Sequence, residues 1–273
     1  MTPERPSDPE PLQLELASGP VMISDHGPDG GRAGTLPILA VHGLPGSHRD
    51  YRWLGAALEP TTRFIRVDLP GFGGTPLETA ASPTIPGRAA ILPQILDALS
   101  IDRACILGHS MGGPVALAAA VRSPDRFPAL ALLASVGLRR HRLLRRSPGS
   151  GLWAAGMKHP LLARPMLGAF RRGLKAMGFP GSYTDLGLIH LASCVAAVSF
   201  EAIATLATET TTPTYLAWAN DDPFIESEIF EEMAAALPEG PRETWTTGGH
   251  NIQKSRALEI RDSLLPWISS LTV

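Results

Sequence analysis

The sequence has few cysteines, no long apolar run and little net charge, and each shortage excludes a class of protein. The two cysteines, Cys105 and Cys194, lie far apart in the sequence. A disulfide framework is therefore not expected, and both thiols are predicted to be buried and reduced. No apolar run approaches the roughly 18 to 20 residues that a membrane-spanning helix needs. The first eleven residues contain four prolines and three acids and lack the apolar core of a signal peptide, so the expected location is the cytoplasm.

The net charge of −2, from 24 Lys+Arg and 26 Asp+Glu, argues against a general nucleic-acid binder. What the chain does have is 273 residues, of which 44% are hydrophobic. That is enough apolar material to bury a large core in one or two domains.

Segments that suit buried strands alternate along the chain with segments of helical periodicity. This alternation predicts an α/β protein with a doubly wound, mostly parallel sheet of about eight strands, covered by helices on both faces. A glycine-rich break is expected at residues 27–31, after the first two strands. The expected strands cover residues 12–16, 21–24, 37–41, 64–69, 104–107, 130–134, 214–219 and 243–246, and the expected helices cover residues 48–58, 91–99, 111–121, 226–237 and 255–265.

This alternation fails between residues 138 and 208. The stretch contains no convincing buried strand and is too long for a loop, so it predicts an inserted, mainly helical subdomain. The expected organisation is a core whose first part is residues 1–137 and whose second part is residues 209–273, with a helical lid at residues 138–208 between them.

A serine stands between an expected strand and an expected helix, in the run Gly108-His109-Ser110-Met111-Gly112. This is the G-x-S-x-G nucleophile elbow in the context that it requires. Glycines are needed there because side chains at the flanking positions would collide with the neighbouring strand and helix. Ser110 is therefore predicted to be a nucleophile at the carboxyl end of the sheet.

A serine hydroxyl is a weak nucleophile near neutral pH, so it needs a base and a group that orients the base. In this type of elbow the chain order is serine, acid, histidine. His250 follows the last expected strand in a glycine-rich loop, which places its imidazole at the same edge of the sheet. The other histidines considered as bases either precede Ser110 or fall in the insertion. His250 is therefore predicted to be the general base.

Two adjacent aspartates compete for the orienting role. Asp221 and Asp222 follow the expected strand at residues 214–219, where a carboxylate could accept a hydrogen bond from the imidazole. Neighbouring side chains point in different directions, so one of the two is expected to reach His250. We favour Asp222, and we expect Asp221 to be a turn residue that bonds its own backbone.

These motifs resemble those of the α/β-hydrolase fold superfamily, of the lid-bearing serine esterase and hydrolase type. The likeness extends over nearly the whole chain and is weakest in the insertion. Residues 42–46 (HGLPG) resemble the superfamily's His-Gly loop after the third strand, and residues 68–75 (DLPGFGGT) resemble its Asp-x-x-Gly-x-Gly turn after the fourth. The superfamily's Gly-x-x-Asp spacing also points to Asp222. Ala219 stands where that pattern usually has glycine, which keeps Asp221 open as the alternative.

The resemblance implies an oxyanion hole formed by the backbone N–H groups of Leu44 and Met111. Fixed amide donors of this kind face the developing oxyanion, and loss of one typically raises the barrier by about 2.7 to 4 kcal/mol. The resemblance also implies that His42 fixes its loop and that Asp68 holds its turn. This chemistry needs neither a metal nor an organic cofactor.

The identity of the nucleophile limits the reaction. Epoxide hydrolases and haloalkane dehalogenases of this fold use an aspartate at the elbow, so Ser110 argues against both. We expect an enzyme that hydrolyses carboxylic esters, or related thioesters and lactones, through an acyl-serine intermediate. The alternatives are a carbon–carbon bond hydrolase or a cofactor-free haloperoxidase or perhydrolase of the same fold. A non-catalytic ligand-binding protein is the least favoured.

Division of the chain shows that the small net charge conceals a strongly basic segment. Residues 138–200 hold 10 basic and 1 acidic side chains (+9), whereas residues 1–137 sum to −3 and residues 201–273 to −8. Three explanations stay open. The segment is a solvated basic face balanced by the acidic C-terminal third, an amphipathic surface for anionic membranes, or a source of arginines that bind an acidic substrate. No module that reads nucleic acids accompanies these residues.

Two aromatic residues are candidates for the substrate pocket. Trp153 lies in the insertion among other large apolar residues, which suggests an apolar underside suited to a hydrophobic acyl or aromatic group. Phe224 follows directly after the favoured acid. The expected partner is a small-molecule ester, either acidic or hydrophobic.

Overall fold

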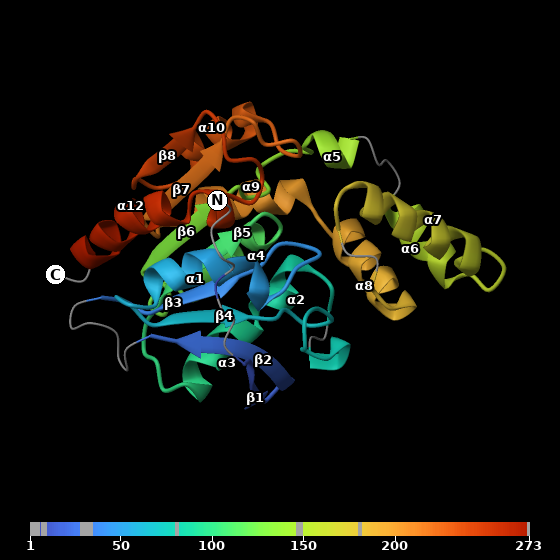
Figure 1. Ribbon diagram of the computed structural model, residues 1–273, viewed down its shortest axis with the longest axis horizontal. Coiled ribbons are helices and arrows are strands. Elements are labelled where there is room, and N and C mark those ends of the chain that lie inside the picture. Colours follow the sequence, from blue (N-terminus) through green and yellow to red (C-terminus); the bar gives the residue numbers. More distant parts are fainter. Residues whose placement is uncertain are drawn as a thin grey trace.

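The computed structural model describes residues 6, 10–27, 35–79, 82–145, 150–179 and 182–271. Its centre is one eight-stranded sheet with the order β1-β2-β4-β3-β5-β6-β7-β8 (Figure 1). β2 is antiparallel to β1 and to β4, and the other five pairings are parallel. The strands are β1 (Leu12–Leu16), β2 (Gly19–His26), β3 (Ile38–Val41), β4 (Phe64–Val67), β5 (Cys105–His109), β6 (Ala129–Leu133), β7 (Thr214–Ala219) and β8 (Arg242–Trp245).

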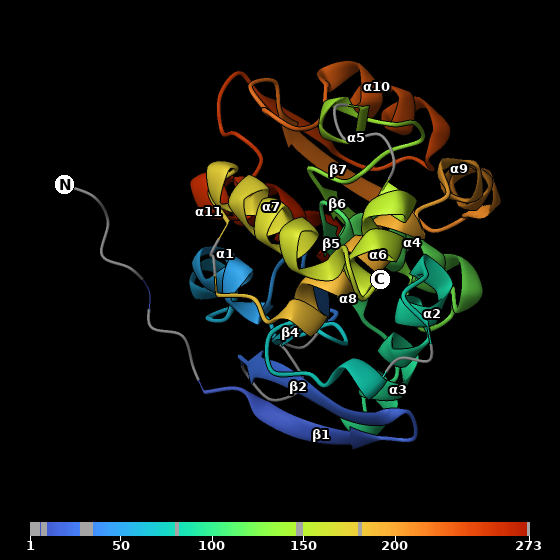
Figure 2. The same cartoon turned by 90° about the vertical axis from the view of Figure 1, so that its right-hand side faces the viewer.

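Helices cover both faces of the sheet (Figure 2). On one face α1, α11 and α12 pack together, and on the other α4 contacts α2 and α9, while α9 contacts α10. The helices of the core are η1 (His48–Tyr51), α1 (Arg52–Leu58), η2 (Leu77–Thr79), α2 (Ile85–Ala89), α3 (Ile91–Ala98), α4 (Gly112–Arg122), α10 (Ser227–Ala236), α11 (Ile252–Ser255) and α12 (Ala257–Ser270).

The central strands are buried along their whole length. Every residue of β3, β4, β5, β6 and β7 is buried, whereas the edge strands β1 and β8 are partly exposed. Because helices cover both faces, these strands have continuous apolar sequences instead of an alternating pattern. The predicted α/β architecture with its mostly parallel sheet is confirmed.

Most of the predicted elements form, and two differences have clear local causes. The short helix α2 was not predicted because Pro86 and Gly87 interrupt its helical pattern; the Thr84 hydroxyl caps it by accepting from the Gly87 N–H. The last predicted helix, residues 255–265, is divided into α11 and α12, which meet at Arg256. The predicted break at residues 27–31 lies outside the described residues, apart from Gly27.

The described residues between β6 and β7 form the helices α5 (Arg142–Arg145), α6 (Ser150–Lys158), α7 (Ala163–Ala176), α8 (Asp185–Ala196) and α9 (Phe200–Glu209). α6, α7 and α8 pack on one another and project from the sheet (Figure 1), whereas α9 packs on α4. Within the described ranges, no single helix is long and apolar enough to cross a bilayer. The bent pair α8 and α9, at 62°, meets the length and composition criteria when taken together.

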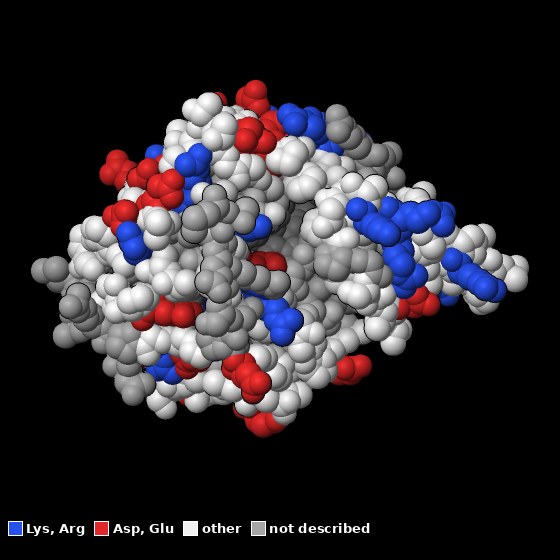
Figure 3. Space-filling model, in the orientation of Figure 1, with Lys and Arg blue, Asp and Glu red and all other residues white. Residues whose placement is uncertain are grey.

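Part of the positive charge of the insertion is balanced by acids next to it. Arg139 forms an ion pair with Glu232 of α10 (2.9 Å), and Arg145 forms one with Glu226 at the start of that helix. Arg171 pairs with Asp185 inside the insertion (2.9 Å). Lys and Arg side chains also gather over the outer surface of α7 (Figure 3). For Arg139 and Arg145, the structure agrees with charge balance by the acidic C-terminal third.

A buried carboxylate holds the turn after β4. Asp68 accepts hydrogen bonds from the backbone N–H of His48 (2.6 Å) and of Gly74 (2.8 Å), and its Oδ1 lies 2.9 Å from the His48 imidazole. Burial by itself raises the pKa of Asp68, but the hydrogen bonds from His48 and the neighbouring imidazole charges outweigh burial, so the pKa lies below its ordinary value. Asp68 therefore has the structural position that its motif implies.

We expect Asp68→Asn to lower the free energy of unfolding by about 2 to 3 kcal/mol near neutral pH, because it weakens charged hydrogen bonds to buried donors. The lowered pKa makes this contribution complete above the unfolded-state pKa of about 3.9 and removes it as the pH falls through the folded-state value. The gap between wild type and variant in urea unfolding should therefore shrink below about pH 4. A gap that widens on acidification would contradict this assignment.

Candidate active site

Ser110 lies on a tight turn between β5 and α4. Its φ of 53° is in the left-handed region that side chains disfavour. Glycines make room for this turn: a Cβ at Gly112 would collide with the carbonyl oxygens of Val41 and His42, and one at Gly108 would lie 2.6 Å from the carbonyl oxygen of Gly112. The turn presents Ser110 at the carboxyl end of the sheet, as the G-x-S-x-G run predicts.

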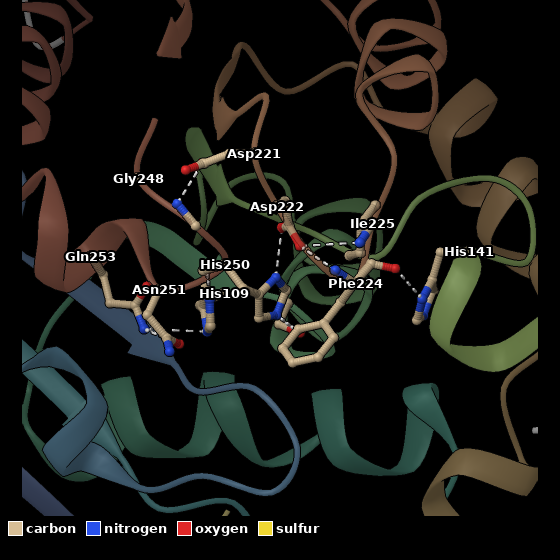
Figure 4. A network of polar contacts seen from close by, with 12 residues as sticks. His109, His141, Asp221, Asp222, Phe224, Ile225, Gly248, His250, Asn251 and Gln253 are labelled. Atoms are coloured by element: carbon tan, nitrogen blue, oxygen red, sulfur yellow. Dashed lines mark hydrogen bonds and ion pairs between the residues drawn. The ribbon is translucent and has the colours of Figure 1, made fainter. Parts of the chain in front are cut away.

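Three side chains from distant parts of the sequence form one hydrogen-bonded series. His250 Nε2 lies 2.8 Å from Ser110 Oγ, and His250 Nδ1 lies 2.7 Å from Asp222 Oδ2 (Figure 4). The three residues follow β5, β7 and β8, whose carboxyl ends meet at the same edge of the sheet because these strands are parallel. With Nδ1–H donating to the carboxylate, Nε2 is left to accept the serine proton.

Asp222 is buried and fully engaged. Its Oδ1 accepts from the backbone N–H groups of Phe224 (2.8 Å) and Ile225 (3.1 Å), which leaves Oδ2 for His250. Burial raises the pKa of this carboxyl, but the hydrogen bond from His250, the imidazole charge and the two backbone donors outweigh burial and lower it overall. Asp222 is therefore an ionised acceptor with a fixed orientation.

Asp221 has a different partner from the one that the sequence suggests. We expected it to bond its own backbone, but its carboxylate accepts from the N–H of Gly249 (2.7 Å), on the loop that carries His250. The expectation was wrong because β8 brings this loop beside the end of β7, and no local pattern records that contact. The two adjacent aspartates thus hold the same loop, Asp222 through the imidazole and Asp221 through the backbone.

His109, which sequence reasoning considered only as a base, holds the His250 loop from the other side. Its Nε2 lies 3.0 Å from the carbonyl oxygen of His250, and the two rings are 5.0 Å apart. Burial, followed by the nearby His250, lowers the pKa of His109 to about 3. His109 is therefore neutral and its Nε2–H donates. Its only sequence signal is its position next to the nucleophile.

The His-Gly loop lies directly beside the nucleophile. A Cβ at Gly43 would lie 3.0 Å from Ser110 Cβ, so the loop backbone approaches closely. His42 accepts from the Leu69 N–H through Nε2 (2.9 Å), and its Nδ1 lies 2.6 Å from the Gly43 carbonyl oxygen. These bonds agree with a loop-fixing role for His42. Leu44 follows Gly43 and Met111 follows Ser110, so both backbone segments flank the serine.

An apolar cavity of about 390 Å³ extends from this loop into the inserted helices. Leu44 lines it from the loop, and Trp153, Phe170 and Leu191 line it from α6, α7 and α8. Phe224 does not line this cavity but packs edge-on against His250, with ring centroids 5.1 Å apart. A larger groove of about 700 Å³ lies between α1 and α12 and involves none of these residues.

The two cysteines and His141 form no hydrogen bond with the triad side chains among the contacts of the described residues. Cys105 and Cys194 are buried and free, and burial raises the pKa of both thiols. His141 Nδ1 lies 3.2 Å from the Phe224 carbonyl oxygen and does not contact the triad side chains. In the part of the chain that the structure describes, no group of three or more His, Cys, Asp or Glu side chains is arranged to hold a metal ion.

Some known proteins resemble only part of this chain, and others resemble most of it. The family model for the α/β hydrolase fold matches residues 37–154. A 2-hydroxy-6-oxononadienedioate/2-hydroxy-6-oxononatrienedioate hydrolase from Cupriavidus pinatubonensis is 26% identical and covers 82% of this chain and 84% of the relative. The dihydrolipoyllysine-residue acetyltransferase component of an acetoin cleaving system from Pseudomonas putida is 38% identical in the matched region. That region is 40% of this chain and 29% of the relative. Two further curated relatives are also matched over less than half of their length.

Solved structures resemble the whole chain. A thermophilic esterase from Thermogutta terrifontis, solved with malate bound, has a TM-score of 0.70 at 20% identity, covering 97% of this chain and 100% of the other. At such low identity the likeness shows the fold alone. The strand order, the position of Ser110 between β5 and α4, and the family model agree with one another. The chain has the α/β-hydrolase fold, and its residues 37–154 match the family model for that fold.

Proposed function

We propose that this chain is a serine hydrolase that cleaves carboxylic esters, or related thioesters and lactones, through an acyl-Ser110 intermediate. The observation that carries the proposal is the hydrogen-bonded series from Asp222 through His250 to Ser110, with distances of 2.7 and 2.8 Å. It supplies the weak serine nucleophile with a base, and it supplies the base with an orienting carboxylate.

In acylation, Ser110 Oγ attacks the carbonyl carbon while His250 Nε2 takes the serine proton. The resulting imidazolium is stabilised by the ionised Asp222. Negative charge develops on the former carbonyl oxygen, and in this proposal that oxygen accepts from the backbone N–H groups of Leu44 and Met111. When the tetrahedral intermediate collapses, His250 gives its proton to the departing alkoxide, so an alcohol leaves and the acyl group stays on the serine.

Deacylation repeats these steps with water as the nucleophile. His250 removes a proton from water as the water oxygen attacks the acyl carbon, and then returns a proton to Ser110 Oγ as the carboxylic acid leaves. His250 must therefore keep one orientation through four proton transfers, two in acylation and two in deacylation. Asp222, Asp221 and His109 each bond the imidazole or its loop, which supports this requirement.

We further propose that α6, α7 and α8 form a lid whose underside receives the acyl chain or another apolar part of the substrate. The support is the cavity of about 390 Å³, which is lined by both the His-Gly loop and these helices. Trp153 and Phe170 stack obliquely in its wall, with centroids 6.2 Å apart. Phe224, packed on His250, would border the reacting carbonyl instead.

A second candidate is hydrolysis of a carbon–carbon bond next to a carbonyl group. It is favoured by the relative from Cupriavidus pinatubonensis, whose likeness covers 82% of this chain. The same triad could serve this reaction, with His250 protonating a carbon leaving group in place of an alkoxide. Comparison of kcat/KM for 4-nitrophenyl esters and for vinylogous 1,5-diketones decides between the two candidates.

Ser110→Ala should lower ester turnover by about 10⁶-fold, because it removes the nucleophile of a group that acts as a unit. It should also abolish labelling by a fluorophosphonate probe. Turnover of a 4-nitrophenyl ester and labelling on a gel measure the two effects, with circular dichroism as a check of folding. Retained turnover in folded variant protein would refute the acyl-serine mechanism.

The adjacent aspartates provide a matched pair of variants. Asp222→Asn should lower kcat by about 10⁴-fold, because it favours the wrong imidazole tautomer. Asp221→Asn keeps an oxygen that can accept from the Gly249 N–H, so we expect less than about a tenfold loss. Steady-state kinetics on one ester measures both. Equal losses in the two variants would contradict the assignment of Asp222 as the orienting acid.

A further inference from the structure

Most of the exposed large apolar side chains of the described residues lie in the inserted helices. Seven such side chains are exposed, and five of them belong to the insertion: Leu152, Leu161, Leu162, Met177 and Leu186. Met177 also lines the apolar cavity, so four leucines are left on the outer surface. Single exposed leucines are ordinary, but their concentration in one small subdomain indicates a contact surface.

Four cations lie in the same helices without acidic partners. Each is exposed, and none forms an ion pair with another described residue: Lys158, Arg164, Arg172 and Lys175. Asp185, the one acid of residues 138–200, pairs with Arg171 instead (2.9 Å). This part of the sequence has no second acid that could offset the four charges.

Leucines and cations follow one another around the turn between α6 and α7. Lys158 is the last residue of α6, and Arg164 lies in the first turn of α7. Between them, the turn holds Leu161 and Leu162, of which Leu161 is 83% exposed. This turn therefore presents apolar and positively charged side chains together to the surroundings.

The cations of α7 extend the same surface along the helix. Arg164, Arg172 and Lys175 stand at positions i, i+8 and i+11, which share one side of a helix with 3.6 residues per turn. Leu167 and Leu174 lie on a different side of α7 and are buried. Figure 3 shows Lys and Arg side chains gathered over this outer surface. α7 is thus amphipathic, with its cationic side directed away from the protein.

The aromatic residues of these helices face the other way. Trp153 and Phe170 line the apolar cavity, so they are not part of the outer surface. The centres of protein–protein interfaces are enriched in aromatic residues and depleted of lysine. The outer surface has the opposite composition, with leucines, two arginines and two lysines.

A bilayer with acidic headgroups fits this composition. Each Lys or Arg near such a surface adds to the attraction, and leucine side chains can enter the boundary between headgroups and acyl chains. α6, α7 and α8 project from the sheet (Figure 1), so the core does not stand between their outer side and a flat membrane. Acidic lipids also need no fixed register with the cations, unlike the acids of a protein partner.

We propose that this outer surface docks on membranes that contain anionic lipids. The docking surface consists of Lys158, Leu161, Leu162, Arg164, Arg172 and Lys175. Its leucines enter the headgroup layer, and its cations contact the acidic headgroups. The same helices line the apolar cavity on their inner side, so docking brings that cavity close to the lipid. The inference does not depend on the proposed ester hydrolysis, because docking can be measured on protein that lacks the nucleophile.

The first test is flotation of the Ser110→Ala protein with lipid vesicles. The protein should float with vesicles made of equal parts of phosphatidylcholine and phosphatidylglycerol, and it should not float with phosphatidylcholine alone. Salt at about 0.5 M should weaken binding, because it screens exposed charges. Absence of binding to the mixed vesicles, or equal binding to both kinds, would overturn the proposal. Binding by a protein that turns over no ester would leave docking intact and refute the hydrolase.

The second test removes the charges. The triple variant Arg164→Gln/Arg172→Gln/Lys175→Gln should lower the partition coefficient onto mixed vesicles by about 100-fold, since each cation near an anionic surface contributes roughly fivefold. The matched control makes the same change in net charge on exposed residues of the core, in the triple variant Arg103→Gln/Arg122→Gln/Lys254→Gln. The control should bind almost as wild type does. Equal losses in the two triple variants would show attraction by net charge alone and contradict a docking surface.

The third test removes the apolar contribution. Leu161→Gln/Leu162→Gln should lower the partition coefficient by about tenfold or more, because two leucine side chains no longer leave water. Leu258→Gln, at an exposed leucine outside the insertion, should have no effect. Unchanged binding of the double leucine variant would show a surface that attracts any polyanion, which would overturn membrane docking.

A second copy of the chain is the rival occupant of this surface. Sedimentation velocity without vesicles should show a monomer for wild type and for the double leucine variant. A wild-type dimer that the leucine substitutions dissociate would assign the surface to self-association and overturn the proposal. All substituted side chains are exposed, so melting temperatures should stay close to that of wild type. If a multiple variant melts early, the single variants Arg172→Gln and Leu161→Gln provide the same comparison with smaller losses.

Discussion

The hydrogen bond between His250 and Ser110 joins residues 140 positions apart, and the rest of the site depends on it. Neither side chain is held by its own loop alone. The sheet places the ends of β5, β7 and β8 at one edge, and the contacts of Asp222, Asp221 and His109 then fix the imidazole and its backbone. A hydrogen bond of this kind needs side chains that are placed to within a fraction of an ångström. A rigid parallel sheet can hold side chains with this precision, whereas a flexible loop cannot.

Among the described residues, three buried charged side chains have several polar partners, whereas Arg88 of α2 does not. Asp68, Asp222 and Arg66 are each buried, and each has at least two polar partners that offset the loss of solvation. Those partners keep the two carboxylates ionised in the interior. The Arg88 side chain is 1% exposed, and neither its Nη1 nor its Nη2 has a hydrogen-bond partner among the described residues.

The sequence pattern was most informative where a catalytic residue also requires a particular backbone geometry. Gly108 and Gly112 around Ser110 identify the elbow, because only glycine fits so close to the backbone of β3 and α4. The central strands were found because burial on both faces gives continuous apolar runs. α2 was missed because Pro86 and Gly87 hide a short helix. Arg88 lies on this helix, and no local sequence pattern indicates that its side chain is buried.

The sequence by itself determined the α/β order, the nucleophile, the histidine and a pair of candidate acids, because each depends on a short motif with its own backbone requirement. Only the tertiary structure decided which aspartate reaches His250, that Asp221 and His109 hold the His250 loop, and that the Arg88 guanidinium is buried. These facts depend on how strands distant in sequence meet at one edge of the sheet. Contacts of that kind are set by packing, and packing has no short-range signature in the chain.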